Sequence, residues 1–407
     1  MLKISLFLFA AASYCLAEGE VEPSTEKWHY PGHEFDRTRL GDAVDLASMK
    51  LLKEAYTTKD DKNIVASPIG VLLLLSLYAA GAEGGIRDEI IKAVGSSNYD
   101  EMFESYTRLS SKFSFMDSSY LTLANKVYVA DNMELANDFS TRAVQSYNSE
   151  VEKVDFTKPA DAVAIINKWA DEKTKGHIKD AVTEDVIDDT VVSVLCNVIF
   201  FQGHWNVPFN ASETVEKDFH VDKSKTVKKQ MMHLEQPLFY QESPELGAKM
   251  IELPYKENGF RMVVVLPDEI DGLSSVMEKV AQKGLLADVF ALSPAGREIH
   301  LDLPKFEIKS GLDLNGLLPK IGVSKIFSDP AQGIVKDVPV KVSKAFQKAF
   351  VKVDEEGATA GAFTGFVIVP TSLNSQPPPA VQFKVDRPFL FAILHEDILL
   401  FAGTYTH

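Results

Sequence analysis

Hydrophobic residues in the first half of the chain recur at helical spacing. After Asp42, where the pattern favours a helix start, apolar side chains fall three or four positions apart, at Leu46, Met49, Leu52 and Tyr56. Residues 71–80 are almost entirely apolar and end at Gly81, which predicts a helix buried in the core. Residues 164–174 form a further helical pattern, with apolar residues expected on one side, Ile165 and Trp169.

The second half of the chain instead carries short, nearly continuous apolar runs. Residues 190–201 form the longest of these runs, which is typical of a strand buried on both faces. Further strands are expected at 262–266, 299–303 and 346–353, and a terminal hairpin at 389–394 and 398–403. Helices concentrate early, strands late, and no repeat or linker divides the chain. We therefore expect an α+β fold with large sheets, folded as one unit.

Composition narrows the class of protein. A length of 407 residues allows two or three ordinary domains or one unusually large domain. Apolar residues make up 45% and charged residues 25%, as in globular proteins. The net charge of -16 disfavours a nucleic-acid partner, because an acidic surface repels phosphates. No stretch reaches the roughly 18 apolar residues of a membrane span, so no membrane partner is expected.

The N-terminus has the pattern of a secretory signal. In residues 1–17, Lys3 precedes an apolar core at 4–12 and a small-residue cleavage site. We expect residues 18–40 to be a polar extension and 41–407 the folded domain. Cleavage would remove Cys15 and leave Cys196 as the one thiol, so that no internal disulfide could form. The expectation is a secreted, extracellular protein stabilised by a large core.

Motifs for catalysis are missing from the sequence. It holds no nucleophile elbow, phosphate-binding loop, dinucleotide fingerprint or paired-histidine zinc motif. Cys196 lies in the most apolar run and is expected to be buried and inert. His177 and His204 are expected to be structural. We therefore predict no enzyme activity, no metal site and no cofactor.

Two polar features are expected at the surface. The sequon at Asn210, completed by Ser212, predicts an exposed glycosylation site. A basic run is expected to form the solvated face of a strand, with anion binding as the alternative; its members are Lys223, Lys225, Lys228 and Lys229.

Residues 354–388 are the most informative stretch. An acidic break at 354–356 precedes thirteen residues, 357–369, without charge or proline, and a triple proline follows at 377–379. In an extended conformation small or apolar side chains share one face: Ala358, Ala360, Ala362, Thr364, Phe366 and Ile368. The other face carries Thr359, Gly361, Phe363, Gly365 and Val367. The segment is an ordinary strand followed by a loop, or a segment that is an exposed loop in one state and an inserted strand in another.

Motifs in order along the chain give a family resemblance. From about residue 42 to 404 the sequence resembles the serpins, the serine protease inhibitor fold. The matching segments are 63–68, 81–84, 166–169, 174–178, 197–205, 208–209, 252–255, 265–267, 303–306, 342–357, 387–391 and 401–403.

The resemblance implies a fold and a mechanism. The fold would be one large domain with a main mixed sheet, two smaller sheets, surrounding helices and an exposed reactive-centre loop at about 355–380. A target serine protease would cleave this loop and form a covalent acyl-enzyme. Insertion of the cleaved loop into the main sheet would then trap the enzyme. The protein would act as a monomer.

Individual roles follow from the matched positions. The hinge of the loop would comprise Glu355, Glu356, Gly357, Ala358, Thr359, Ala360, Gly361 and Ala362. Sheet opening would involve Ser67, Asn197, Trp205 and Gln347. The reactive bond would join Thr371 and Ser372, with cleavage after Phe366, Val369 or Leu373 as alternatives.

The loop composition indicates the class of target. No Arg or Lys occurs between Lys352 and Lys384, which excludes trypsin-like and thrombin-like targets and favours elastase-like or chymotrypsin-like enzymes. Two alternatives remain: a non-inhibitory carrier or binding protein of the same fold, and an inhibitor of papain-like cysteine proteases.

Three residues depart from the family pattern. Ile86 stands where relatives often carry threonine, Gly70 where they often carry serine, and Gln347 where many carry histidine. The amide of Gln347 could still hydrogen-bond to Asn197. Residues 99–120 hold no cluster of Lys or Arg, so the resemblance gives no support for glycosaminoglycan activation there.

Overall fold

The computed structural model describes residues 36–118, 120–188, 190–356 and 378–407, all within the compact unit Pro31–His407. The predicted signal segment, most of the polar extension and loop residues 357–377 lie outside the described residues.

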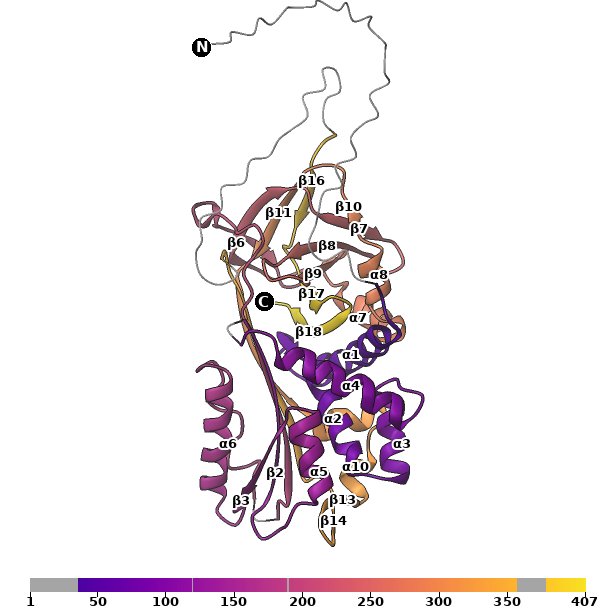
Figure 1. Cartoon of the computed structure of the whole chain (residues 1–407). Helices are drawn as coiled ribbons and strands as arrows, with labels where there is room; N and C mark the ends of the chain where they lie inside the picture. The colour runs from indigo at the N-terminus through magenta and orange to yellow at the C-terminus, as the bar shows by residue number, and fades with distance from the viewer. Residues whose placement is uncertain (1–35, 119, 189, 357–377) are drawn as a thin grey trace, which may run out of the picture. The chain divides into compact units, whose positions relative to one another are not determined.

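The mixed sheet that the resemblance implies has five strands (Figure 1). Their order across the sheet is β12 (Phe306–Asp313), β15 (Lys344–Val353), β4 (Ser193–Phe201), β2 (Leu121–Ala130) and β3 (Glu150–Val154). β15 and β4 pair in parallel, whereas β12 with β15 and β2 with β4 pair antiparallel. All nine residues of β4 are buried, as its continuous apolar run predicts.

Two further sheets adjoin the mixed sheet. An antiparallel sheet of seven strands has the order β1 (Ile64–Ala66), β18 (Ile398–Tyr405), β17 (Phe389–His395), β9 (Phe260–Pro267), β8 (Ala248–Pro254), β7 (Phe239–Ser243) and β10 (Ser293–Pro294). A sheet of four strands has the order β16 (Val381–Lys384), β11 (Ile299–Pro304), β6 (Thr226–Gln236) and β5 (Val215–His220). β13 (Ala331–Val335) and β14 (Val338–Val340) form a separate hairpin. The seven-stranded sheet thus has more strands than the mixed sheet, although each is no longer than eight residues.

Helices surround these sheets. They are α1 (Arg39–Thr58), α2 (Pro68–Ala80), α3 (Gly84–Ala93), α4 (Tyr99–Ser114), α5 (Asn137–Thr141), α6 (Pro159–Lys173), α7 (Leu273–Lys283), α8 (Leu286–Phe290), α9 (Leu314–Leu317) and α10 (Lys325–Ser328). Short turns of other helix types occur at Arg142–Ser146, Ala211–Glu213 and Leu318–Ile321. Of the described helices none is both long enough and apolar enough to cross a membrane.

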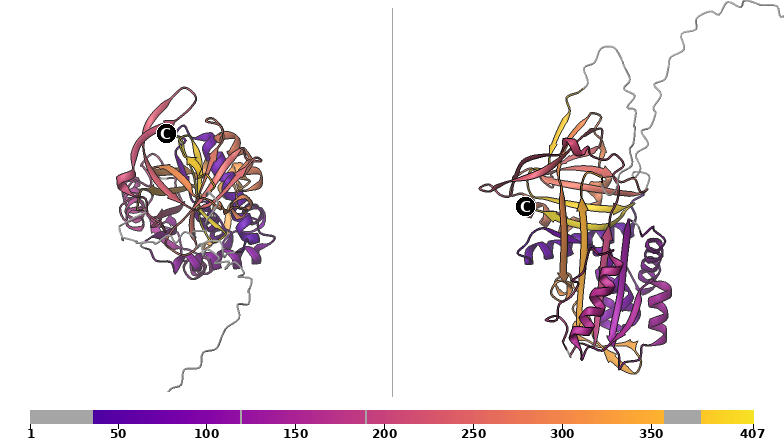
Figure 2. Two further views of the ribbon diagram at one scale, coloured as in Figure 1. Left: turned by 90° about the horizontal axis from the view of Figure 1, so that it is seen from above. Right: turned by 90° about the vertical axis from the view of Figure 1, so that its left-hand side faces the viewer.

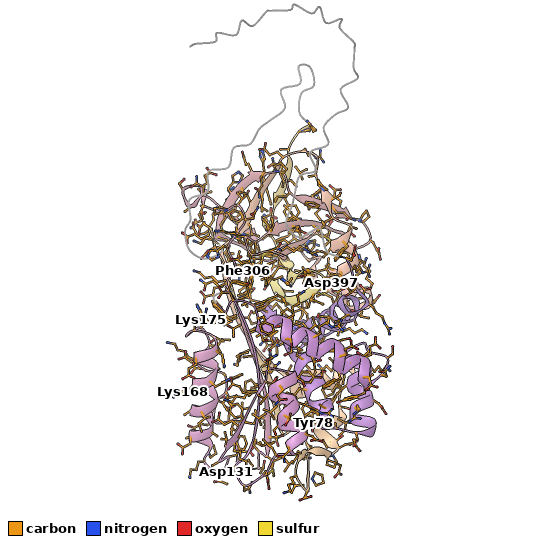
Figure 3. All side chains as sticks on the ribbon, in the orientation of Figure 1. Tyr78, Asp131, Lys168, Lys175, Phe306 and Asp397 are labelled. Atoms are coloured by element: carbon orange, nitrogen blue, oxygen red, sulfur yellow. The ribbon has the colours of Figure 1, made fainter. Side chains whose placement is uncertain are left out.

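Helix α1 begins earlier than the apolar pattern indicates. It starts at Arg39 rather than Asp42, because the Thr38 side chain accepts a hydrogen bond from the Gly41 backbone N–H and caps the first turn. The expected polar extension therefore ends before residue 40. The Thr38 hydroxyl also donates to Asp397, in the turn between β17 and β18 (Figure 3).

The mixed sheet has helices on both faces, as two views show (Figures 1 and 2). α6 covers one face, where its buried residues Ile166 and Trp169 join a hydrophobic cluster with residues of β2, β4 and β15. Ile165, which the sequence pattern places on the same side of this helix as Trp169, is 37% exposed, and the next residue, Ile166, is the one that is buried. α2 packs against the other face, and almost all of it is buried.

Phe306 joins the mixed sheet to the seven-stranded sheet (Figure 3). Its ring stacks on Tyr405 of β18 with centroids 5.0 Å apart and lies 5.3 Å from Phe391 of β17. Aromatic contacts of this kind stabilise beyond the area that they bury. They fix the start of β12 on the neighbouring sheet.

Candidate functional site

The candidate site is the boundary between strands β4 and β15, which we call the seam. The two strands run parallel in unbroken register from Lys344 opposite Val194 to Val351 opposite Phe201. β15 ends at Val353, and the acidic residues 354–356, which include the first two predicted hinge residues, follow directly. The seam and the start of the loop therefore share one end of the mixed sheet.

Three buried amides on β15, β4 and β2 are linked by hydrogen bonds, one of which crosses the seam. With Ser67 they form what we call the amide cluster: Ser67, Asn125, Asn197 and Gln347. Gln347 Nε2 donates to Asn197 Oδ1 at 2.7 Å, and Asn197 Nδ2 donates to Asn125 Oδ1 at 2.8 Å. Gln347 also bonds to both backbone groups of Ser67, accepting from its N–H at 2.8 Å and donating to its carbonyl at 2.6 Å. The cluster therefore joins β15, β4 and β2 to the start of α2.

The departure at position 347 thus keeps the expected hydrogen bond to Asn197. The departure at Gly70 has a steric reason here. A Cβ atom on Gly70 would lie only 2.4 Å from Asn197 Nδ2, so the glycine leaves room for the amide. Ile86, the third departure, is buried in α3.

A second group of residues holds the hinge at the end of the seam, and we call it the hinge anchor: Trp205, Phe209, Thr214, Lys305 and Glu355. Trp205 Nε1 donates to the Asp354 carbonyl at 2.8 Å, and the backbone N–H of Phe209 donates to the Glu355 carbonyl at 2.8 Å. Trp205 is itself fixed by stacking on Tyr255, with centroids 4.4 Å apart. The first hinge residues are thus bound to the segment that follows β4.

The Glu355 carboxylate is the charged centre of the hinge anchor. Lys305 Nζ lies 2.6 Å from Glu355 Oε2, and the Thr214 hydroxyl donates to Glu355 Oε1 at 2.7 Å. Burial alone would raise the pKa of Glu355, but the hydrogen bonds from Lys305 and Thr214 outweigh it and lower that pKa. The carboxylate is therefore held in its charged form.

His177 lies across the seam on the α6 side. Its ring stacks on Phe200 of β4 and on Phe350 of β15, with centroid distances of 4.8 Å and 4.4 Å. The expectation that His177 is structural agrees with these contacts. The ring and the loop that carries it cover both strands of the seam.

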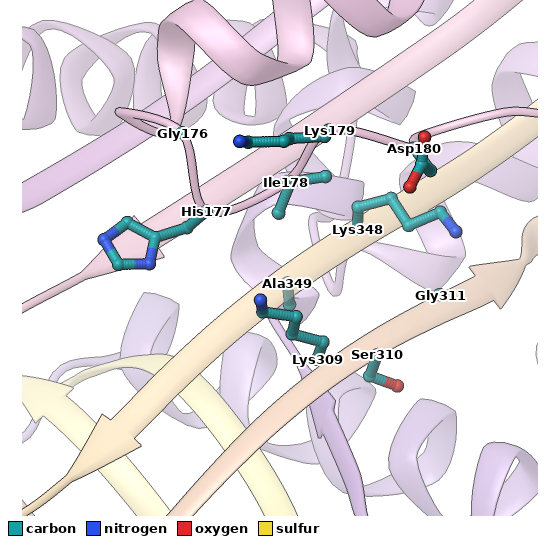
Figure 4. Close-up of a pocket in the computed structure, with 10 residues that line it drawn as sticks. All are labelled: Gly176, His177, Ile178, Lys179, Asp180, Lys309, Ser310, Gly311, Lys348 and Ala349. Carbon is teal, nitrogen blue, oxygen red and sulfur yellow. The ribbon is translucent and has the colours of Figure 1, made fainter.

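Beside His177 lies a pocket of about 450 Å³ between residues 176–180 and the strands β12 and β15 (Figure 4). Lys309 and Lys348 line it from the two strands. Burial, and then the positive charge of Lys59, lower the pKa of Lys348. The pocket shows that the loop after α6 does not fill the space over this end of the sheet.

The remaining predicted residues lie apart from the seam or are inert. Cys196 is fully buried, and burial raises the pKa of its thiol, as expected of an unreactive cysteine. His204 Nδ1 lies 2.7 Å from Glu257 Oε1, in agreement with a structural role. Asn210 is exposed at the start of a short 3-10 turn, where its side chain accepts from the Ser212 N–H.

The basic run lies on and around the β5–β6 hairpin, where two of its members are paired. Lys223 contacts Asp271 at 2.7 Å and Lys228 contacts Asp218 at 2.8 Å, in keeping with a solvated strand face. Hinge residues 357–362 and the predicted bond between Thr371 and Ser372 lie outside the described residues.

Sequence reasoning missed three residues of the site. Asn125 completes the amide cluster, and Thr214 and Lys305 complete the hinge anchor. Lys305 falls in a segment that carries the family resemblance, but its ion pair spans fifty residues of sequence. Only the fold brings it to Glu355.

Comparisons with known proteins agree on one family. The family model described as serpin (serine protease inhibitor) matches residues 43–407. Alaserpin of Manduca sexta is 34% identical over 373 residues, covering 89% of this chain and 93% of its own length. Antichymotrypsin-2 of Bombyx mori is 34% identical over 369 residues, covering 90% and 97%.

Solved structures give the same result. Serpin48 of the insect Tenebrio molitor matches with a TM-score of 0.79 and 31% identity, covering 91% of this chain and 98% of that chain. Human thyroxine-binding globulin complexed with its hormone has a TM-score of 0.79 at 24% identity, covering 91% and 99%, which shows the fold alone.

Proposed function

Because this chain belongs to the serpin family, we propose that it is a secreted suicide substrate that traps a serine protease of elastase-like or chymotrypsin-like specificity. The observation that carries the proposal is the parallel seam between β4 and β15, which lies directly beside the start of the reactive loop.

The seam supports insertion on energetic grounds. A segment that leaves the end of β15 and turns back between the two strands runs antiparallel to both of them. Insertion therefore replaces one parallel pairing by two antiparallel pairings, and parallel pairing is slightly less stable per residue. The exchange adds one strand to the sheet and a second row of backbone hydrogen bonds.

The length of the loop fits this movement. Residues 358–371 span roughly 45 Å when extended at about 3.3 Å per residue. The face formed by Ala358, Ala360 and Ala362 is small enough to enter a sheet that is covered by helices on both sides. The hinge anchor holds residues 354–356, which leaves the residues after Glu356 as the part of the loop that would insert.

Chemically, the protease serine attacks the carbonyl carbon of Thr371. An ester forms between the enzyme and Thr371, the peptide bond to Ser372 breaks, and Ser372 leaves with a free amino group. If the loop inserts before water hydrolyses the ester, the bound protease moves with Thr371 away from the loop's original position and stays covalently attached.

Covalent complex formation is the direct test. Mixed with elastase, the protein is expected to give a complex that survives boiling in detergent. The mass of the released C-terminal fragment should correspond to a peptide that begins at Ser372. A matched variant, Thr371→Arg, should lose complex formation with elastase and gain it with trypsin. Clean cleavage without a complex, by elastase, chymotrypsin and cathepsins alike, would instead support a non-inhibitory binding protein.

The secreted location is a separate part of the proposal. The apolar segment within residues 1–17 and the exposed Asn210 both support it. Expression in insect cells should deliver the chain to the medium, and Asn210→Gln should remove one glycan from its mass.

A further inference from the structure

Two half-buried lysine side chains meet at the edge of the mixed sheet, in a place that the proposed function does not use. Lys348 of β15 lies opposite Gly311 of β12. Its ammonium group lies over this glycine, since a Cβ atom on Gly311 would be only 2.7 Å from Lys348 Nζ (Figure 4). Lys59, directly after α1, donates from Nζ to the Gly311 carbonyl at 2.7 Å. Two ammonium groups from distant parts of the chain therefore converge on one backbone position.

No carboxylate balances these two charges. Neither Lys59 nor Lys348 forms an ion pair with any residue that the structure describes. Of the residues that line the pocket beside His177, Asp180 alone carries a carboxylate, and its attraction is outweighed, because burial and then Lys59 lower the pKa of Lys348. Like charges that are partly removed from water cost free energy. An anion bound between the two lysines would offset that cost.

The rest of this pocket is also positively charged. Its wall carries two more ammonium groups, Lys179 from the loop after α6 and Lys309 of β12. Lys309 has a carboxylate neighbour, Glu307, at 3.5 Å. Even so, burial and then the charge of Lys309 lower the pKa of His177 at the other end of the pocket. The electrostatic potential is therefore positive at both ends, beside His177 and beside Lys348.

Gly311 gives a second, independent indication of a ligand. It stands in the interior of β12, where a glycine weakens a strand and often marks the close approach of a ligand or another backbone. Its φ is not positive, so the backbone conformation does not require a glycine here. The missing side chain instead leaves room for the Lys348 ammonium group and for an anion beside it.

We propose that a small phosphorylated ligand binds here, with a phosphate group between Lys59 and Lys348 at Gly311. A phosphate monoester carries a charge of about -1.5 to -2 at neutral pH, which matches two ammonium groups. Gly311 lines both the pocket of about 450 Å³ and an adjoining cavity of about 300 Å³ that Lys59 also lines, and these volumes suit a small molecule. Lys179 and Lys309 face a second acidic group of the ligand. The site does not depend on protease inhibition.

Calorimetric titration of the full chain with sodium pyrophosphate, at fixed ionic strength, tests the site. We expect one binding site per chain and a roughly 10-fold loss of affinity in Lys59→Gln and in Lys348→Gln, since each removes one charged hydrogen bond. Gly311→Ala changes no charge but displaces the Lys348 ammonium group, so it should also weaken binding. Lys225→Gln, in the exposed basic run, is the matched control and should leave the affinity unchanged.

Three results of this titration would overturn the proposal. They are the absence of binding at millimolar pyrophosphate, unchanged affinity in both Lys59→Gln and Lys348→Gln, and an equal loss in Lys225→Gln. Heparin that binds through these lysines when pyrophosphate does not would also overturn it, because the ligand would then be a sulfated polysaccharide.

Chemical labelling keeps the test independent of folding defects in the variants. A lowered pKa leaves more of the Lys348 side chain as the free amine that reacts with acetic anhydride. Pyrophosphate should slow acetylation of Lys348 and Lys59 in the native chain, whereas sodium chloride at the same ionic strength should not. Mass spectrometry of the peptides measures the labelling. Equal acetylation of both lysines with and without saturating pyrophosphate would contradict the site.

Discussion

At the scale of single residues, Gln347 is the hydrogen-bond partner of three buried polar groups. Its amide bonds to the N–H and carbonyl of Ser67 and to the Asn197 side chain, and all three residues are fully buried. The amide therefore stabilises the closed seam only while each of its partners stays in place.

Removing this amide should be costly. Gln347→Ala leaves three polar groups without partners, so we expect a loss of about 2–4 kcal/mol in the free energy of unfolding. Denaturant titration measures the loss. Gln332→Ala, at an exposed position of β13, is the matched control and should change stability by less than about 0.5 kcal/mol. Equal effects of the two changes would contradict the role given to the amide cluster.

Glu355 predicts a dependence on pH. Its pKa is lowered in the folded protein, because the hydrogen bonds from Lys305 and Thr214 outweigh burial, which alone would raise it. A lowered folded pKa contributes stability that is present above the ordinary glutamate pKa, about 4.3, and is lost as the pH falls through the folded value. The free energy of unfolding of the native chain should therefore fall below pH 4.3 more steeply than that of Glu355→Gln.

The size of this effect should be modest, up to about 1 kcal/mol, since Lys305 is 39% exposed. Glu356→Gln is the control, because Glu356 is a neighbouring exposed carboxylate. If Glu356→Gln flattened the acid limb as much as Glu355→Gln, general charge rather than the hinge anchor would explain the dependence.

At the scale of elements, the sequence predicts those whose burial is uniform. β4 and α2 are apolar at most of their positions and buried along almost their whole length, so composition alone identifies them. β2 is half-buried in its first part and includes the polar Asn125 and Lys126, and no strand is predicted there. Lys126 is buried because Glu150 and Glu152 of β3 pair with it, an arrangement that no local pattern encodes.

The site follows the same rule. Sequence reasoning finds the uncharged loop, because thirteen residues without charge stand out in one window. It names Glu355 and Trp205 but does not find Thr214 and Lys305 of the hinge anchor, because these residues meet Glu355 only after the strands pair. Long-range pairing of single polar residues leaves no periodic signal.

Insertion of the loop as a new strand can be tested with two substitutions, one on each face of that strand. Ala360→Asp places a charge on the small-residue face of the loop, which is expected to be buried when the loop inserts. The cost of burying that charge should oppose insertion. The variant should be cleaved by the target protease with little covalent complex left. Thr359→Asp adds the same charge on the other face, which we assign to the α6 side, where the pocket beside His177 leaves open space over the seam, and this variant should keep more of the complex. Gel densitometry measures the ratio of covalent complex to cleaved product. An equal loss of complex in both variants would contradict the assignment of faces.

At the scale of the whole molecule, sheet opening requires that no covalent link cross the seam. Cys196, the one cysteine among the described residues, is buried in β4 directly opposite Phe346 of β15. The two side chains lie in the same hydrophobic cluster on the α6 side. Cys196, to which the resemblance gives no role, thus marks a position where one added cysteine can link the two strands of the seam covalently.

Phe346→Cys should form a disulfide with Cys196 across the seam. Neighbouring strands lie about 4.8 Å apart, within the roughly 4.4–6.8 Å that a disulfide spans between Cα atoms. In the oxidised state the sheet cannot open, so the target protease should cleave the loop and leave without a covalent complex. Reduction should restore trapping to the level of Phe346→Ala, which has the same loss of packing and no new thiol. Trapping by the oxidised variant, with the disulfide verified by mass spectrometry, would show that the loop does not insert between β4 and β15.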